Sequence, residues 1–142
     1  MKLFFLTILS FSILSFFACQ EDEPISIYQY DVHIHAPSTA AKQLGDTLEI
    51  EFEFESHTGE PVHHINVRIY NKATNVEVYN LPVEPHVHDL IGAHTYTDQF
   101  VLSAANRLAE GDWILEGKVW GHEDGLEETT EKLEFHINPS VE

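Results

Sequence analysis

Hydrophobic and polar residues alternate along most of this chain, most clearly in the stretch TLEIEFEFES at residues 47–56. The aliphatic and aromatic residues fall on one side of an extended chain and the glutamates on the other. Successive side chains of a strand point to opposite faces, so the pattern predicts a strand with one face on a core and one in water. Six further runs show the same period, at 28–35, 65–70, 76–81, 95–102, 113–120 and 130–137, and only 103–109 favour a helical turn.

Turn-forming residues separate these runs, among them Gly45-Asp46 and Gly111-Asp112. Seven short strands divided by such turns predict an all-β fold, an immunoglobulin-like antiparallel β-sandwich of about seven strands. An open barrel or jelly roll would give the same alternation, but the strand count favours the sandwich. The stretch RLAEGDWILEGKVWGHEDGLEETTEKLEFHI, residues 107–137, resembles the last two strands of bacterial immunoglobulin-like modules, which implies the same fold.

The chain opens with an apolar run, 3–18, behind the basic residue Lys2. The run is short for a membrane span and no stop-transfer charges follow it, so it predicts a secretory signal peptide. It ends on Phe16-Phe17-Ala18-Cys19, which resembles the lipobox of bacterial lipoproteins, with phenylalanine in place of the usual leucine. The resemblance implies that Cys19 carries lipid and anchors the protein to a membrane. An ordinary signal peptide followed by a chance cysteine is the alternative.

We therefore expect a signal peptide at 1–18, a lipidated cysteine with an acidic tether at 19–25 and the β-sandwich domain at 26–142. The residues behind Cys19 read QEDEP. An acidic run in this place resembles the signal that sends lipoproteins of Bacteroidota to the outer face of the outer membrane. The resemblance implies an outer-membrane lipoprotein that faces the cell exterior. The periplasmic face, with the run as a plain flexible tether, is the alternative.

Acidic residues outnumber basic ones by 24 to 7, a formal net charge of −17, and removal of Lys2 with the signal peptide makes it −18. Such a surface repels nucleic acid and anionic lipid and attracts cations. Nucleic acid is therefore not expected as a partner, whereas a metal cation is.

All ten histidines follow residue 28, and most of them fall in three connections between predicted strands. In an immunoglobulin-like sandwich these connections gather at one pole. Neutral imidazole is the commonest ligand for transition metals, and a His-x-His pair on extended backbone turns both rings to one side. We therefore predict a metal site at this pole. Its first candidate ligands are His86, His88 and His122, its further ones are His57, His63, His64 and Asp89, and His94, Glu123 and Asp124 lie in the same connections.

A second, smaller metal cluster is predicted where the first and last strands can run side by side. His33 and His35 share the outward face of the run 28–35, and His136 lies on the outward face of 130–137.

The composition narrows the choice of metal. The chain has one cysteine and one methionine, and the predicted lipidation and cleavage remove both as ligands. Zinc–thiolate, blue-copper and methionine-rich Cu(I) sites are thereby excluded. Histidine and carboxylate suit Zn(II), Cu(II) or Ni(II), so Zn or Cu(II) is expected, with no organic cofactor. Alternatively the histidines are solvated or pH-sensing residues. His63 and His94 fall on the same side of their strands as the inward-facing residues, so each could instead be a half-buried, hydrogen-bonded histidine.

The segment HVHD, residues 86–89, resembles the His-Val-His of copper–zinc superoxide dismutase, another β-sandwich, but the likeness ends there. No Gly-Asp-Gly-Asn-type zinc loop follows, a single cysteine allows no intramolecular disulfide, and neither Arg68 nor Arg107 lies in a motif that would guide superoxide. The serines lack a nucleophile elbow. We therefore do not expect an enzyme.

The motifs together resemble the small, histidine-rich, immunoglobulin-like lipoproteins of Bacteroidota, whose domain has no assigned function. The residues predict a non-catalytic lipoprotein that binds a divalent transition metal ion at the envelope. An adhesion or accessory module whose loops bind a glycan or a protein, such as an envelope protein partner, is the alternative.

Overall fold

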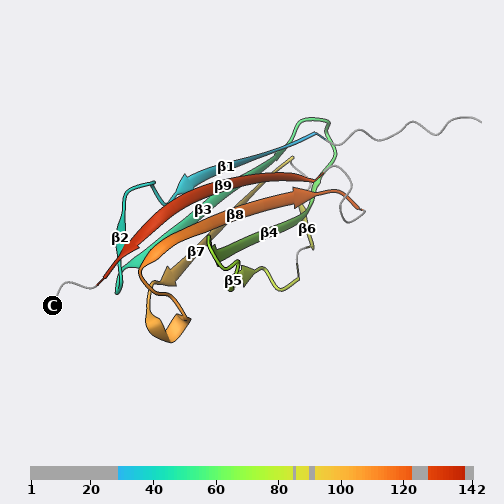
Figure 1. Cartoon of the computed structure of the whole chain (residues 1–142). Helices are drawn as coiled ribbons and strands as arrows, with labels where there is room; N and C mark the ends of the chain where they lie inside the picture. Colours follow the sequence, from blue (N-terminus) through green and yellow to red (C-terminus); the bar gives the residue numbers. More distant parts are fainter. Residues whose placement is uncertain (1–28, 85, 90–91, 123–127, 140–142) are drawn as a thin grey trace, which may run out of the picture.

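The computed structural model describes residues 29–84, 86–89, 92–122 and 128–139 (Figure 1). Within these residues the chain forms two β-sheets that enclose one hydrophobic core. The immunoglobulin-like antiparallel β-sandwich expected from the alternation is therefore confirmed, with one parallel pair between the two-residue strand at Lys42–Gln43 and the strand at Thr129–Asn138. The predicted signal peptide and Cys19 lie outside the described residues.

The smaller sheet has the strand order β1–β3–β7, at Tyr30–Ala36, Thr47–Ser56 and Ala93–Val101. The larger sheet has the order β2–β9–β8–β4–β5, at Lys42–Gln43, Thr129–Asn138, Gly111–Trp120, Val62–Asn71 and Glu77–Leu81. A further strand, β6 at His86–Asp89, pairs with the beginning of β4. All seven predicted strands appear, and within the described residues the pattern missed the short β2 and β6. A 3-10 turn at Ala104–Asn106 occupies the segment that favoured a helix.

The alternating residues of β3 form the centre of the core, as the pattern predicts. Leu48, Ile50, Phe52 and Phe54 are each at most 2% exposed, and they face the buried residues of β4 and β8 in the opposite sheet. Gly117 of β8 lies against Phe52, because a Cβ atom built on Gly117 would be 2.3 Å from Cε1 of that ring. The missing side chain makes room for the phenyl ring between the sheets.

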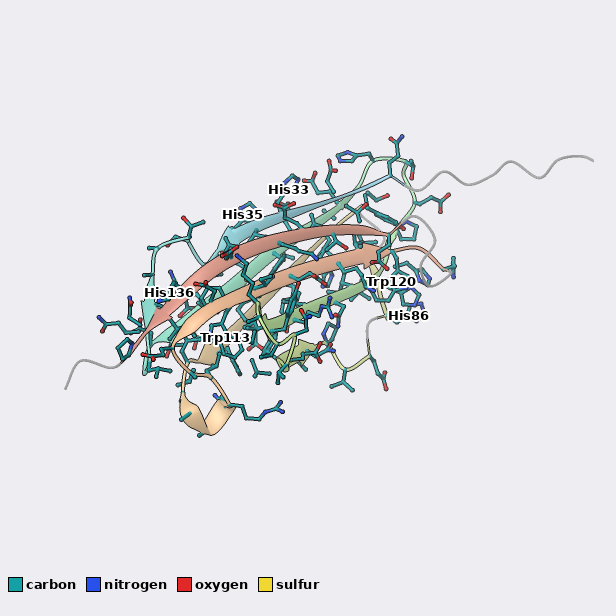
Figure 2. All side chains as sticks on the ribbon, viewed as in Figure 1. His33, His35, His86, Trp113, Trp120 and His136 are labelled. Atoms are coloured by element: carbon teal, nitrogen blue, oxygen red, sulfur yellow. The ribbon has the colours of Figure 1, made fainter. Side chains whose placement is uncertain are left out.

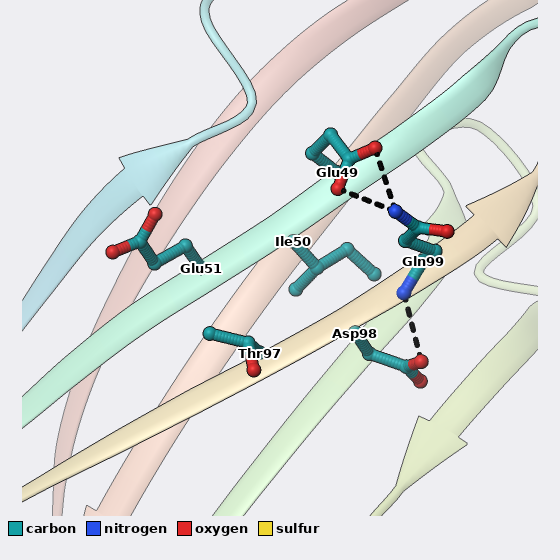
Figure 3. A pocket seen from close by; sticks show the side chains of 6 residues that line it. All are labelled: Glu49, Ile50, Glu51, Thr97, Asp98 and Gln99. Carbon is teal, nitrogen blue, oxygen red and sulfur yellow. Dashed lines mark hydrogen bonds between the residues drawn. The ribbon is translucent and has the colours of Figure 1, made fainter.

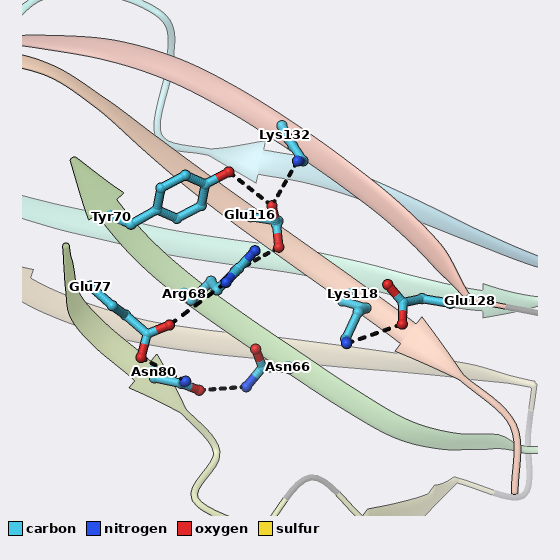
Figure 4. Close-up of polar contacts among 9 residues, drawn as sticks. All are labelled: Asn66, Arg68, Tyr70, Glu77, Asn80, Glu116, Lys118, Glu128 and Lys132. Carbon is cyan, nitrogen blue, oxygen red and sulfur yellow. Dashed lines mark hydrogen bonds and ion pairs between the residues drawn. The ribbon is translucent and has the colours of Figure 1, made fainter. Parts of the chain in front are cut away.

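Two polar networks add to the apolar packing. On the outer face of the larger sheet, the buried carboxylate of Glu116 accepts hydrogen bonds from Arg68 Nε at 2.6 Å and Tyr70 Oη at 3.0 Å, and pairs with Lys132 Nζ at 3.0 Å (Figure 4). Burial raises the pKa of Glu116, but the hydrogen bonds from these three partners outweigh it and hold the pKa below its usual value. The carboxylate is therefore buried in its charged form.

The second network joins β5 of the larger sheet to β7 of the smaller one. The Tyr79 hydroxyl lies 2.6 Å from that of Tyr96 and donates to Asp98 at 2.5 Å. Burial, followed by the hydrogen bond with Asp98, raises the pKa of Tyr79 far above its usual value, so this phenol stays protonated.

No helix in the described part of the chain has the length and apolar character to cross a bilayer.

Candidate metal centre

Three histidines meet at the end of the sandwich where β4 begins, β6 pairs with it and β8 ends. His63 and His64 belong to β4 and His86 to β6, and each offers a ligand nitrogen within 4.8 Å of the other two. Among the described residues, this is the one group of three or more metal-ligating side chains at such spacing. Figure 2 shows His86 and Trp120 near this end, far from Trp113 and His136. We call these three residues the histidine cluster.

Strand pairing assembles one side of the cluster. His64 is the register partner of His86 on β6 and of Trp120 on β8. Residues paired across neighbouring antiparallel strands have adjacent side chains on the same face. The three rings therefore stack: the His64 ring lies 4.5 Å from His86 at an interplanar angle of 12°, and 5.1 Å from Trp120 at 10°. The β4–β6 register shifts after this pair, between His64 and Val62, which indicates a β-bulge.

His63 is the buried member of the cluster, at 3% exposure. Its parity on β4 is that of Ile65 and Val67, which face the core. Its Nδ1 lies 2.9 Å from Nδ1 of His64, and both of its ring nitrogens lie 3.1 Å from Nε2 of His86. Two nitrogens on one tetrahedral zinc ion are about 3.3 Å apart, given Zn–N bonds of about 2.0–2.1 Å. The nitrogens of His63 and His86 are thus spaced nearly as two ligands of one metal ion would be, whereas Nδ1 of His64 also lies 2.7 Å from the carbonyl oxygen of Gly121.

A fourth predicted ligand lies next to the cluster. His122 follows the end of β8, and its exposed ring has its centroid 3.8 Å from that of His63. The structure thus brings together His63, His64, His86 and His122 from the predicted set. His88 and Asp89 lie on β6, but their side chains, like Glu123 and Asp124, lie outside the described residues.

His57 does not join the cluster, although its connection leads to the same pole. Its Nε2 lies 2.8 Å from Oδ2 of Asp31 and 3.9 Å from Oε2 of Glu55, on β1 and β3 of the smaller sheet. His94, half-buried on β7, is the register partner of Phe54.

The residues of the second predicted cluster pair separately. His33 Nε2 is 3.7 Å from a Glu55 oxygen and His35 Nε2 is 3.0 Å from a Glu53 oxygen, both across the β1–β3 pair. His136 Nδ1 is instead 2.7 Å from Asp112 Oδ1 on β8. The side chains of the three histidines thus turn to carboxylates on the strands beside them, and the structure does not gather them into one group.

Two residues that were not predicted, Trp120 and Gly121, also contact the cluster. Besides the Trp120 stack, the carbonyl oxygen of Gly121 lies 2.7 Å from Nδ1 of His64. The tripeptide Trp120-Gly121-His122 at the end of a predicted strand is the signal in the sequence, because it places an aromatic ring and a backbone carbonyl directly before a candidate ligand.

One surface hollow lies apart from the cluster, between β3 and β7 (Figure 3). Its lining includes Glu49, Glu51 and Asp98, and the side-chain amide of Gln99 donates to both oxygens of Glu49 at 3.0 and 3.1 Å. No histidine lines it, and its carboxylate at Glu49 already has a partner, so the histidine cluster is the better candidate for a metal site.

A scan against protein-family models gave no match, and a search of curated proteins gave none. Several solved structures resemble the chain. The solution NMR structure of the CARDB domain of a Pyrococcus furiosus protein is 15% identical, with a TM-score of 0.51 over 78% of this chain and 95% of that one. The crystal structure of that CARDB domain in complex with di-metal ions is 13% identical, with a TM-score of 0.49 over 81% and 97%. CopC from Methylosinus trichosporium OB3b is 18% identical, with a TM-score of 0.37 over 78% and 98%. At these identities the likeness concerns the fold alone.

Proposed function

We propose that this protein is a non-catalytic lipoprotein that binds a divalent transition metal ion, Zn(II) or Cu(II), through His63, His64 and His86. The observation that carries the proposal is the convergence of three imidazole nitrogens within 4.8 Å at one end of the sandwich. The residues come from two strands, and one of them is 3% exposed. His122 is the proposed fourth donor: its ring packs against that of His63, and the side chain would have to turn to bring a nitrogen into the group that His63, His64 and His86 form.

The chemistry of the donors supports Zn(II) or Cu(II). Imidazole is a borderline ligand that suits both ions, and a cluster of histidines alone offers neither the thiolates of structural zinc sites nor the thioethers that favour Cu(I). The formal charge of −17 adds a long-range attraction for cations. A fourth donor such as His122 would close a tetrahedral site, as in structural zinc sites, and this closed arrangement favours binding over catalysis.

The proposed location is the outer membrane, with the domain facing the cell exterior. It rests on the apolar leader, the lipobox-like Phe16-Phe17-Ala18-Cys19 and the acidic run behind it. A lipid on Cys19 would hold the metal site close to the envelope, where an envelope protein could supply or take up the ion.

Isothermal titration of the mature, detergent-solubilised protein with Zn(II), and separately with Cu(II), tests the proposal. We expect near-stoichiometric binding that is lost in His86→Ala. The matched control is His136→Ala, because this histidine is half-exposed and lies near the other end of the sandwich. Binding that is equally weak in all three proteins would overturn the proposal and favour the glycan- or protein-binding module.

A further inference from the structure

Three consecutive residues at the end of β8 contact the histidine cluster, each in a different way. Trp120 stacks on His64, the Gly121 carbonyl accepts from His64, and the His122 ring packs on His63. The first two of these contacts converge on one imidazole and constrain it from two directions.

The contact with Gly121 decides which nitrogen of His64 is available to a metal. Nδ1 of His64 lies 2.7 Å from the carbonyl oxygen of Gly121. A carbonyl oxygen can only accept a hydrogen bond, so the proton of the neutral ring lies on Nδ1. Nε2 then carries the lone pair that a metal ion needs. A ligating histidine that donates its other N–H to a backbone carbonyl is held in one tautomer and is a stronger donor.

The contact with Trp120 fixes the plane of the same ring. Trp120 is 6% exposed, and its indole lies 5.1 Å from the His64 ring at 10°. On the other side of the stack is His86, at 4.5 Å and 12°. An imidazole between two nearly parallel rings cannot turn about its side-chain bond without displacing one of them. Lys118 Nζ lies 4.8 Å from the centre of the indole ring, which adds a cation–π contact that helps to hold the tryptophan.

We infer that Trp120 is a positioning residue of the metal site: with the Gly121 carbonyl, it holds His64 in the plane and tautomer that present Nε2 to the ion. This inference rests on the proposed function. Trp120 does not bind the metal itself, so its contribution is to affinity, through the orientation of a ligand. Loss of a partner that orients a ligating histidine typically weakens metal binding about 10–100-fold.

The test compares the Zn(II) affinity of the wild-type mature protein with Trp120→Ala and Trp120→Phe. We expect W120A to weaken binding about 10–100-fold, and W120F to restore most of the affinity because a phenyl ring can still stack on His64. Trp113, buried and bonded through Nε1 to the Ala109 carbonyl at 3.0 Å, remains as a fluorescent probe of folding in every variant. If wild type binds and W120A binds equally tightly, the inference fails while the proposed function stands. If wild type does not bind, both fail.

Two spectroscopic measurements need no stable W120A protein. Nitrogen-15 NMR of the imidazoles in Zn(II)-loaded wild type should show His64 with its proton on Nδ1 and zinc on Nε2. The opposite assignment would overturn the inference. Cu(II), a paramagnetic ion, should quench the fluorescence of Trp120 in wild type, and the quenched component should be missing in W120F. Quenching that persists in W120F would place the ion near Trp113 instead, and would also overturn it.

Discussion

Gly117 of β8 is expected to be one of the least replaceable residues of the sandwich, and Gly117→Ala tests how its two sheets meet. A Cβ atom at this position would lie 2.3 Å from Cε1 and 2.5 Å from Cδ1 of Phe52. Carbon atoms in contact are about 3.5–4.0 Å apart, so the ring or the strand must move by more than 1 Å. Phe52 is 0% exposed and stacks on Phe54 at 5.7 Å and 7°, which leaves it no free space to enter.

The magnitude follows from two opposing effects. Overpacking a filled core costs about 1–3 kcal/mol, and a clash of this size against a rigid ring belongs at the upper end. Alanine in place of glycine within a strand returns about 0.5–1 kcal/mol. We therefore expect G117A to lower the free energy of unfolding by about 2 kcal/mol and the melting temperature by about 8 °C.

Urea unfolding followed by tryptophan fluorescence measures this loss. The control is the same substitution in a Phe52→Leu background, where the shorter side chain leaves room for the new methyl group. A double-mutant cycle should then give a coupling free energy above about 0.5 kcal/mol, because G117A should cost less stability in the Phe52→Leu background than in wild type. Equal losses in both backgrounds, or a G117A protein as stable as wild type, would refute the close approach of Gly117 to Phe52.

Three further outcomes follow from the same structure. Zn(II) at a hundredfold excess over its dissociation constant should raise the free energy of unfolding by about 2.7 kcal/mol in wild type and not in His86→Ala, measured by thermal unfolding. The pKa of Glu116 is lowered from 4.5, so its charged form stabilises the fold above that pH, and the gain is lost as the pH falls through the lower folded value. Acid titration of stability should therefore show a decline below about pH 4.5 that is weaker in Glu116→Gln, and an unchanged profile would contradict the network. Tyr79→Phe removes the hydroxyl that joins Tyr96 and Asp98, and should cost about 1–2 kcal/mol in urea unfolding. A loss near zero would mean that water replaces these bonds.

The fold could be predicted from the sequence because its strands have one solvent-exposed face and one buried face. The alternation of 47–56 identified Leu48 and Phe54 as core residues directly, since strand geometry alone decides which residues share a face. β6 was missed for the converse reason. Its four residues, HVHD, are mostly polar, and they form a strand through pairing with β4 instead of through an apolar face of their own.

The histidine cluster could be predicted only as far as the pole on which it lies. The expected topology placed His63, His86 and His122 at one end, and the structure brings them together there. His57 was predicted at the same pole, but its ring pairs with Asp31 on the smaller sheet. Loops that gather at one pole still belong to two sheets, and the sheet decides which residues a side chain can reach.

The carboxylate partners of the strand histidines depend on the strand register, which the hydrophobic pattern does not contain. His33 and His35 lie on β1 of the smaller sheet and His136 on β9 of the larger one, and each has a carboxylate on a neighbouring strand within 4 Å. Which carboxylate is closest follows from the strand register, and register is set by pairing between residues far apart in the chain.

His63 is the strongest argument that the cluster is more than a by-product of the fold. A side chain at 3% exposure stabilises a sandwich best when it is apolar, as Val62, Ile65 and Val67 on the same strand are. A buried imidazole must instead find partners for its nitrogens, or lose about 1–3 kcal/mol. Here nitrogens of His64 and His86 lie 2.9 and 3.1 Å from those of His63. One divalent ion would satisfy all three lone pairs at once. A position that departs from the rule for its own strand is where function is expected to outweigh stability.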